Sequence, residues 1–246
     1  MKLNRGLISI VASIGLLHGV CFAQTIDSIS TTPTNKLDAA WWKTRHEQKV
    51  ELAKKGNIDL LLIGDSITHG FEGSGKAMWE KYYAPRKALN LGYSGDRTEH
   101  VLWRLDNEEI AGLSPKLAII MIGTNNTGHR KERPEMIKEG VKAICDKLRA
   151  KLPNTKILIL AIFPRSEKAT DEARVNNDEA NKLISKLADD KSIFFLDINS
   201  KFLEADGTLT KEMMPDFLHP GGKGYQIWAE AIEPMVAKLM GDEPKK

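Results

Sequence analysis

Short apolar runs alternate along the chain with longer segments in which apolar residues recur every three or four positions. Each run is soon followed by Gly, Pro or Asn, a pattern typical of buried strands, whereas the longer segments have the period of amphipathic helices. This alternation predicts an α/β fold in which a five-stranded parallel sheet is covered on both faces. The expected strands are Ile58–Ile63, Ala88–Leu91, Leu117–Ile122, Ile157–Ile162 and Ile193–Ile198. The expected helices are Trp41–Lys55, Thr98–Leu105, Pro134–Leu152, Asp171–Ala188 and Gly222–Met240.

The composition is that of an ordinary globular protein. Of the 246 residues, 41% are hydrophobic and 28% are charged, which excludes a disordered or low-complexity chain. The net charge of +3 indicates neither a nucleic-acid partner nor an anionic membrane surface. No repeat and no linker rich in Gly, Pro or Ser divides the sequence, so we expect one domain.

The N-terminus has the pattern of a secretory signal. Lys2 and Arg5 precede the apolar stretch Leu7–Phe22, and a small residue suited to cleavage follows. A membrane anchor is the alternative, but the stretch is shorter than the roughly 20 apolar residues that a spanning helix needs, and His18 interrupts it. We therefore predict that residues 1–23 are removed and that the protein is exported to the periplasm or the extracellular space, without stable membrane insertion.

The predicted mature domain, residues 24–246, retains one cysteine, Cys145, so no disulfide within the chain is expected. Cys145 shares a helical face with Ile144 and Leu148, which predicts a buried structural thiol rather than a nucleophile. The histidines are scattered and show no zinc-binding spacing, so we expect neither a metal nor a cofactor.

Candidate chemistry gathers where the predicted strands end, because ligands bind beyond the carboxyl ends of the strands in open parallel sheets. Polar, glycine-containing segments follow three of the runs: Gly64–Thr68, Gly92–Asp96 and Gly123–Asn126. A fourth polar segment, Pro215–Gly222, precedes the last helix. We expect these segments to meet in space.

Together these segments contain a serine-hydrolase constellation. Ser66 lies at a strand-to-helix transition, where a hydroxyl can be exposed, and is the candidate nucleophile. His219 is the candidate base, and Asp216, three residues before it, would orient its imidazole. The backbone N–H groups of Ser66 and Gly95 and the side-chain amide of Asn125 are the candidate oxyanion-hole donors.

The candidate substrate-binding residues are Asp65, Arg97 and Asn126. For Asp65 we also expect a role in organising the turn beneath Ser66, and for Arg97 a surface salt bridge is an equally good interpretation. Trp41 and Trp42 are expected to pack, with a substrate platform as the alternative. Any one of these segments alone could be a turn or a helix cap. Their combination is what indicates chemistry.

At these positions the sequence resembles the SGNH (GDSL) hydrolase family. The resemblance is carried by four blocks: Ile63–Ile67, Gly92–Asp96, Gly123–Asn126 and Asp216–His219. Within the family it is strongest to the branch of the intracellular platelet-activating-factor acetylhydrolase catalytic subunits, through ALNLGYSGDRTEHVLWRL, IGTNN, FPRSEK and DFLHPGGKGY. The resemblance extends from Ile58 to Leu239. It implies a flavodoxin-like three-layer α/β/α fold and metal-free ester hydrolysis by Ser66, His219 and Asp216.

Two features depart from that branch: Arg97 replaces a small hydroxyl residue, and a secretory signal is present. We therefore predict an exported esterase that removes short acyl groups, chiefly acetyl, from carbohydrate or another small-molecule ester. A lysophospholipase or thioesterase acting on long acyl chains is one alternative, and a non-catalytic carbohydrate-binding protein on the same fold is the other. Because the resembled subunits dimerise, the resemblance includes a homodimer as an option, while the sequence leaves the oligomeric state open. A dinucleotide-binding enzyme is excluded, since no expected strand is followed by G-x-G-x-x-G.

Overall fold

A computed structural model describes residues 29–245. Its centre is a parallel sheet of five strands in the order β2-β1-β3-β4-β5, which is the flavodoxin-like order. The predicted α/β fold and its five-stranded parallel sheet are therefore confirmed. The strands are β1 (Leu60–Gly64), β2 (Ala88–Gly92), β3 (Leu117–Met121), β4 (Lys156–Leu160) and β5 (Ile193–Leu196).

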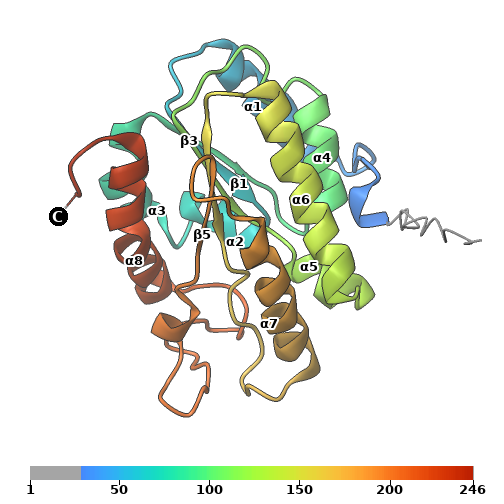
Figure 1. Cartoon of the computed structure of the whole chain (residues 1–246), viewed down its shortest axis with the longest axis vertical. Coiled ribbons are helices and arrows are strands. Elements are labelled where there is room, and N and C mark those ends of the chain that lie inside the picture. Colours follow the sequence, from blue (N-terminus) through green and yellow to red (C-terminus); the bar gives the residue numbers. More distant parts are fainter. Residues whose placement is uncertain (1–28, 246) are drawn as a thin grey trace, which may run out of the picture.

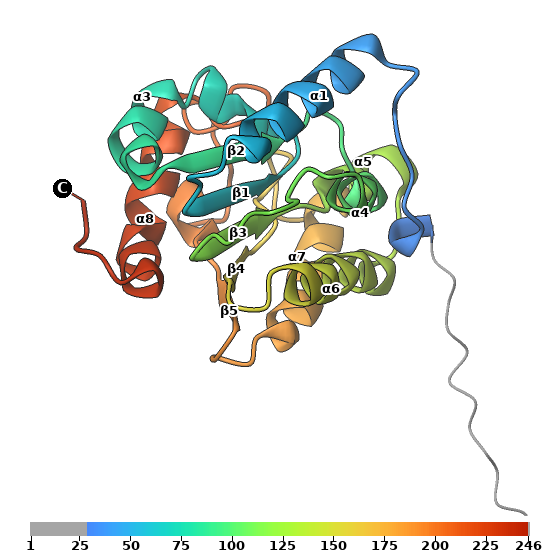
Figure 2. The same cartoon turned by 90° about the horizontal axis from the view of Figure 1, so that it is seen from above.

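Helices cover both faces of this sheet, giving three layers (Figures 1 and 2). One face carries α4 (Thr98–Asp106), α6 (Pro134–Lys151) and α7 (Glu172–Ile184), with α1 (Ala40–Lys54) running along the β2 edge. The opposite face carries α8 (Gly222–Met240) and the short α3 (Lys76–Met78). The remaining helices, α2 (Ser66–His69) and α5 (Thr124–Arg130), directly follow β1 and β3.

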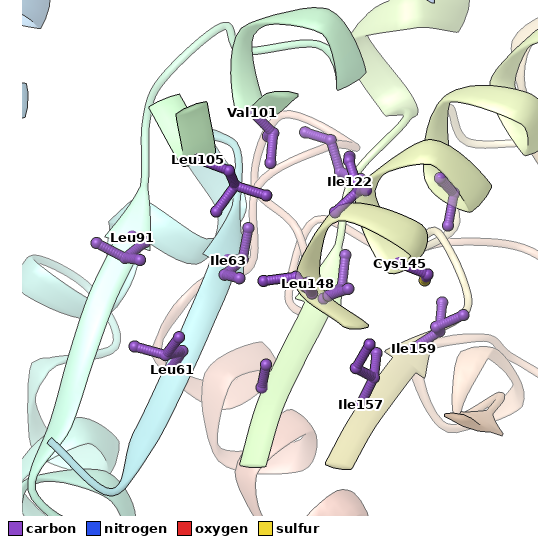
Figure 3. Close-up of a cluster of buried hydrophobic side chains, with 14 of the residues drawn as sticks. Leu61, Ile63, Leu91, Val101, Leu105, Ile122, Cys145, Leu148, Ile157 and Ile159 are labelled. Atoms are coloured by element: carbon purple, nitrogen blue, oxygen red, sulfur yellow. The ribbon is translucent and has the colours of Figure 1, made fainter. Parts of the chain in front are cut away.

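The apolar runs form strands because both faces of the sheet are buried. All residues of β1 and β3 are buried, and alternate side chains enter two separate hydrophobic clusters. Figure 3 shows the cluster on one face, where Leu61 and Ile63 of β1 meet Leu105 of α4 and Leu148 of α6. Cys145 lies in this cluster at 1% exposure, as a structural residue.

The structure adds helical elements between β1 and β2, where none was predicted from the sequence. There the chain forms α2, α3 and short 3₁₀ and π-helical turns that end at Arg86. Strands β3, β4 and β5 end one or two residues earlier than expected, because their last apolar residues belong to buried loops rather than to the ladder. Strands β1 and β2 end one residue later than expected. Pro234 is expected from the sequence to kink the last helix or to restart it, because proline lacks a backbone N–H; α8 instead continues through this residue as one helix. Trp42 is fully buried, whereas Trp41 is half exposed.

The predicted signal, residues 1–23, lies outside the described residues. Within residues 29–245, no helix is both long enough and apolar enough to cross a membrane.

We expect Leu148→Ala to lower the free energy of unfolding by about 2–5 kcal/mol, because the side chain is completely buried between α6 and the sheet and its removal leaves a cavity. Urea unfolding followed by circular dichroism measures this change. The matched variant Leu52→Ala, at a position that is 40% exposed, should change the same quantity by less than about 0.5 kcal/mol. Equal losses in the two variants would contradict the layer arrangement.

Candidate active site

The strand register brings the polar segments to one level. Gly64 at the end of β1 is paired with Gly92 of β2 on one side and with Met121 of β3 on the other. Ser66, Ser94 and Gly123 each lie two residues after one of these three paired positions, so they leave the sheet at the same level. The strand order reverses between β1 and β3, so this edge is also the topological switch point, where open α/β sheets bind ligands.

Helix α2, which begins at Ser66, is held against β2 by close backbone packing. A Cβ atom at Gly92 would lie 2.2 Å from the backbone nitrogen of His69, so only glycine permits this approach. The side chain of Asn90 donates to the carbonyl of Thr68 at 3.1 Å. At the other end, the Asp65 carboxylate caps the helix by accepting the N–H of Ile67 at 2.9 Å. The position of Ser66 is thereby fixed by two strands.

Ser66, His219 and Asp216 form a continuous hydrogen-bonded chain. The Ser66 Oγ lies 2.8 Å from the Nε2 of His219, and the Nδ1 of His219 lies 2.7 Å from an Asp216 Oδ. His219 and Ser66 are partly exposed at the surface, so a substrate can reach them. This is the geometry in which an imidazole can accept a proton from a serine hydroxyl while a carboxylate fixes its tautomer.

The loop that carries His219 is organised by Asp216 itself. One Asp216 oxygen accepts the backbone N–H groups of Leu218 at 3.1 Å and His219 at 2.7 Å, which leaves the other oxygen for the imidazole. Partial burial alone would raise the pKa of Asp216, but the hydrogen bonds from His219 and from these N–H groups hold it below its usual value. Asp216 is therefore a carboxylate at neutral pH.

Gly95 and Asn125, the candidate oxyanion donors, lie side by side. Gly95 has φ +71°, which glycine adopts without strain, and its N–H has no protein acceptor within residues 29–245. The Asn125 amide donates to the carbonyl of Asp96 at 2.9 Å, next to the Gly95 peptide. Ser66 is the first residue of α2. Its N–H is therefore one of the first amide groups of the helix, which have no hydrogen-bond partner inside the helix.

A buried set of charged side chains holds the Gly95–Asp96 loop. Asp96, fully buried, accepts hydrogen bonds from the Nε1 of Trp42 at 2.8 Å and the Nε of Arg104 at 3.0 Å. Arg104 is also fully buried; it donates to Glu109 and lies 3.9 Å from the centre of the Tyr93 ring. Helices α1 and α4 thus anchor the loop from behind.

The serine and histidine open into a shallow hollow of about 560 Å³. It is lined by Ser66, His69, Gly70, Glu72, Gly73, Ser94 and His219, so no aliphatic, Phe, Tyr or Trp side chain borders it. A second hollow, of about 540 Å³ and bordered by Gly128, Arg165 and Val175, includes neither Ser66 nor His219. Among the described residues, no group of three or more His, Cys, Asp or Glu side chains could hold a metal ion.

Comparison with known proteins identifies the family of the chain. Residues 62–227 match the model of the GDSL-like Lipase/Acylhydrolase family. The chain belongs to this family. The acylhydrolase is 32% identical over 209 residues to platelet-activating factor acetylhydrolase IB subunit alpha2 of Rattus norvegicus, a match that covers 83% of this chain and 87% of that protein.

Solved structures share the fold of the acylhydrolase. A GDSL-like lipase from Bacteroides thetaiotaomicron matches with a TM-score of 0.65 at 18% identity, covering 79% of this chain and 97% of that one. A catalytic mutant of an acetylxylan esterase from Geobacillus stearothermophilus matches with a TM-score of 0.60 at 19% identity, covering 76% of this chain and 96% of that one.

The predicted substrate-binding residues of the acylhydrolase lie elsewhere than expected. Asp65 and Asn126 are fully buried, and the Asn126 amide donates to Thr98 and Glu132, so in this structure both support the site from beneath instead of lining the hollow. Arg97 caps α4 and pairs with Glu99 at 2.6 Å. None of the three borders the hollow that contains Ser66.

Three residues that do border the hollow were not identified from the sequence: His69, Glu72 and Ser94. The available signal was their spacing. His69 lies one helical turn after Ser66, and Ser94 occupies the position in its segment that corresponds to Ser66 in the β1 segment.

Burial raises the pKa of Asp65 to about 7, although the hydrogen bond from the Ile67 N–H and the nearby His219 both act to lower it. The Oδ2 of Asp65 has no hydrogen-bond partner among the described residues. An unfolded chain has the ordinary pKa of 3.8, so between about pH 4 and pH 7 the native state binds the extra proton. The stability contributed by this carboxyl is therefore present at low pH and is lost as the pH rises to about 7.

The variant Asp65→Asn, which cannot titrate, should become progressively more stable relative to the wild type across this range, by up to about 4 kcal/mol from pH 4 to pH 8. Urea unfolding at several pH values measures the difference. Asp38→Asn, at an exposed site, is the control: it measures how the loss of one carboxyl group by itself changes the free energy of unfolding. A difference for Asp65→Asn that stays constant with pH would contradict the raised pKa.

Proposed function

We propose that this acylhydrolase is a serine esterase that removes short acyl groups, principally acetyl, from the hydroxyls of carbohydrate. The observation that carries the proposal is the chain of hydrogen bonds from Ser66 through His219 to Asp216, with distances of 2.8 Å and 2.7 Å. It provides a nucleophile, a base and an orienting carboxylate without a cofactor.

In the first half of the reaction, the Ser66 Oγ attacks the acyl carbonyl while the Nε2 of His219 accepts the hydroxyl proton. The carbonyl oxygen becomes an oxyanion that the N–H groups of Ser66 and Gly95 and the Asn125 amide stabilise; losing one such donor typically costs about 2.7–4 kcal/mol. The C–O bond to the alcohol then breaks, and the alcohol leaves with the proton from His219.

In the second half, His219 removes a proton from water, which attacks the acyl-serine. The same oxyanion donors stabilise the second tetrahedral intermediate. Its collapse breaks the bond to Oγ, returns the proton to Ser66 and releases the carboxylic acid. Asp216 keeps the imidazole in one tautomer throughout and stabilises its protonated form.

Two observations favour a short acyl group on a polar alcohol. The hollow at Ser66 is shallow and lined by polar side chains and glycine, whereas a long acyl chain needs an extended apolar wall. The names of two similar proteins, an acetylhydrolase subunit and an acetylxylan esterase, both refer to acetyl esters. A binding protein that lacks catalysis is disfavoured by the intact Ser66–His219 contact.

We expect hydrolysis of p-nitrophenyl acetate and butyrate and little turnover of the palmitate ester, because no aliphatic, Phe, Tyr or Trp side chain lines the shallow hollow to hold a long chain. Ser66→Ala should lower kcat on the acetate ester by about 10⁴-fold or more, since a triad acts as a unit. Steady-state kinetics across the ester series measures both effects.

Ser185→Ala is the matched control, because that hydroxyl caps the end of α7 by donating to the Lys182 carbonyl. It should keep the wild-type rates. Full activity in Ser66→Ala would overturn the proposed mechanism, and a preference for the palmitate ester would favour the lipid-hydrolase alternative.

We further propose that the protein is exported and that cleavage after Ala23 yields a chain beginning at Gln24. The support is the Lys2 and Arg5 flank and the apolar stretch Leu7–Phe22. Expression of the full chain in a Gram-negative host, followed by intact-mass analysis of the periplasmic fraction, should give the mass of residues 24–246. An uncleaved chain in the cytoplasmic fraction would contradict export.

A further inference from the structure

The hollow at Ser66 contains a second group of polar side chains that the proposed hydrolysis does not use. The Nδ1 of His69 lies 3.1 Å from the Oγ of Ser94, and its Nε2 lies 3.8 Å from a carboxylate oxygen of Glu72. All three residues line the same hollow as Ser66 and His219. They are therefore within reach of whatever part of a substrate extends from the ester.

Glu72 is a fixed carboxylate. Arg45 donates to both of its oxygens at 2.8 Å, and Lys49 donates to one at 2.9 Å. Partial burial alone would raise the pKa of Glu72, but these hydrogen bonds lower it to about 2. The carboxylate is 38% exposed, whereas the side chains of Arg45 and Lys49 are 9% and 10% exposed. The more deeply buried Arg45 and Lys49 of α1 thus compensate the charge of Glu72, while its carboxylate stays accessible from the hollow.

His69 is a neutral imidazole in this setting. Burial and the nearby Arg45 lower its pKa from the ordinary value of 6.5, so at pH 7 and above it has one N–H donor and one acceptor nitrogen. The separation of 3.8 Å between its Nε2 and Glu72 is too long for a direct hydrogen bond. It is short enough for one hydroxyl oxygen to contact both atoms at about 2.8 Å.

These groups match the chemistry of a sugar hydroxyl. A neutral imidazole, a serine hydroxyl and a fixed carboxylate together donate and accept hydrogen bonds without a net positive charge to attract an anion. The methyl group of an acetyl ester can form no hydrogen bond with these side chains. We therefore assign them to the alcohol part of the ester. A lipid alcohol with apolar chains would leave the same groups unpaired, at a cost in binding.

We propose that His69, Ser94 and Glu72 form a hydroxyl-binding subsite for the alcohol part of the substrate, a sugar ring with a free hydroxyl next to its acetylated one; this rests on the proposed esterase function. His69 is the specificity-determining residue of the subsite. Ser94 holds its ring, and Glu72 accepts a hydrogen bond from the sugar hydroxyl. The Ser66 Oγ bonds to His219, so His69 is not the base of the reaction.

The test compares two acetate esters that differ in the alcohol: a mono-acetylated methyl β-xyloside with a neighbouring free hydroxyl, and ethyl acetate, which has no hydroxyl to bind. For His69→Leu we expect kcat/KM on the xyloside to fall about tenfold, largely through KM, with less than a twofold change on ethyl acetate. Ser94→Ala should shift the ratio of the two rates in the same direction by a smaller factor.

Gln226→Leu is the control, because this exposed side chain bonds to Glu230 within α8, does not line the hollow and should leave the ratio unchanged. His69→Gln keeps a donor and an acceptor and should recover part of the xyloside rate, which separates lost recognition from misfolding. An equal fall on both esters in His69→Leu, or no fall on either, would overturn the subsite while leaving the esterase intact. A wild-type protein that hydrolyses neither ester would overturn the esterase function and the subsite together.

Discussion

The ion pair between Asp96 and Arg104 is the interaction on which the candidate site depends. Both side chains are completely buried, and the Asp96 carboxylate also accepts the indole N–H of Trp42. Burying charges is costly unless they are paired, and here Arg104 also pairs with Glu109 while Lys36 lies 3.5 Å from Asp96, so this network of charges holds the loop in place. The Asp96 carbonyl in turn receives the Asn125 amide. The position of the candidate oxyanion donors Gly95 and Asn125 therefore depends on the packing of α1 and α4 against this loop.

Much of the fold and the arrangement of the candidate site could be predicted from the sequence because both rest on local patterns. Apolar runs buried on both faces identify the strands, and the carboxyl ends of parallel strands necessarily meet at one edge. Ser66, Gly95 and Asn125 all follow such ends directly. Asp216 and His219 are three residues apart, a spacing at which one carboxylate can reach both the backbone and the ring of the same histidine.

What could not be predicted depends on contacts between segments far apart in the chain. Glu72 belongs to an irregular segment after α2, and its role comes from Arg45 and Lys49 of α1, 27 and 23 residues earlier. Asn126 is polar and adjacent to Asn125, yet its side chain turns inward to Thr98 and Glu132. No periodicity distinguishes these two asparagines, because the direction of each is decided by which helix packs beside it.

Ser66 and His219 are separated by 153 residues, and α8, which follows His219, supplies Tyr225 to the floor beneath α2 through a 2.7 Å hydrogen bond to the Ile67 carbonyl. During synthesis Ser66 therefore leaves the ribosome long before His219 does. An incomplete chain that ends between residues 66 and 218 contains Ser66 but lacks its hydrogen-bond partner His219. The connectivity therefore allows the Ser66–His219–Asp216 arrangement to form only after nearly the whole chain has been translated.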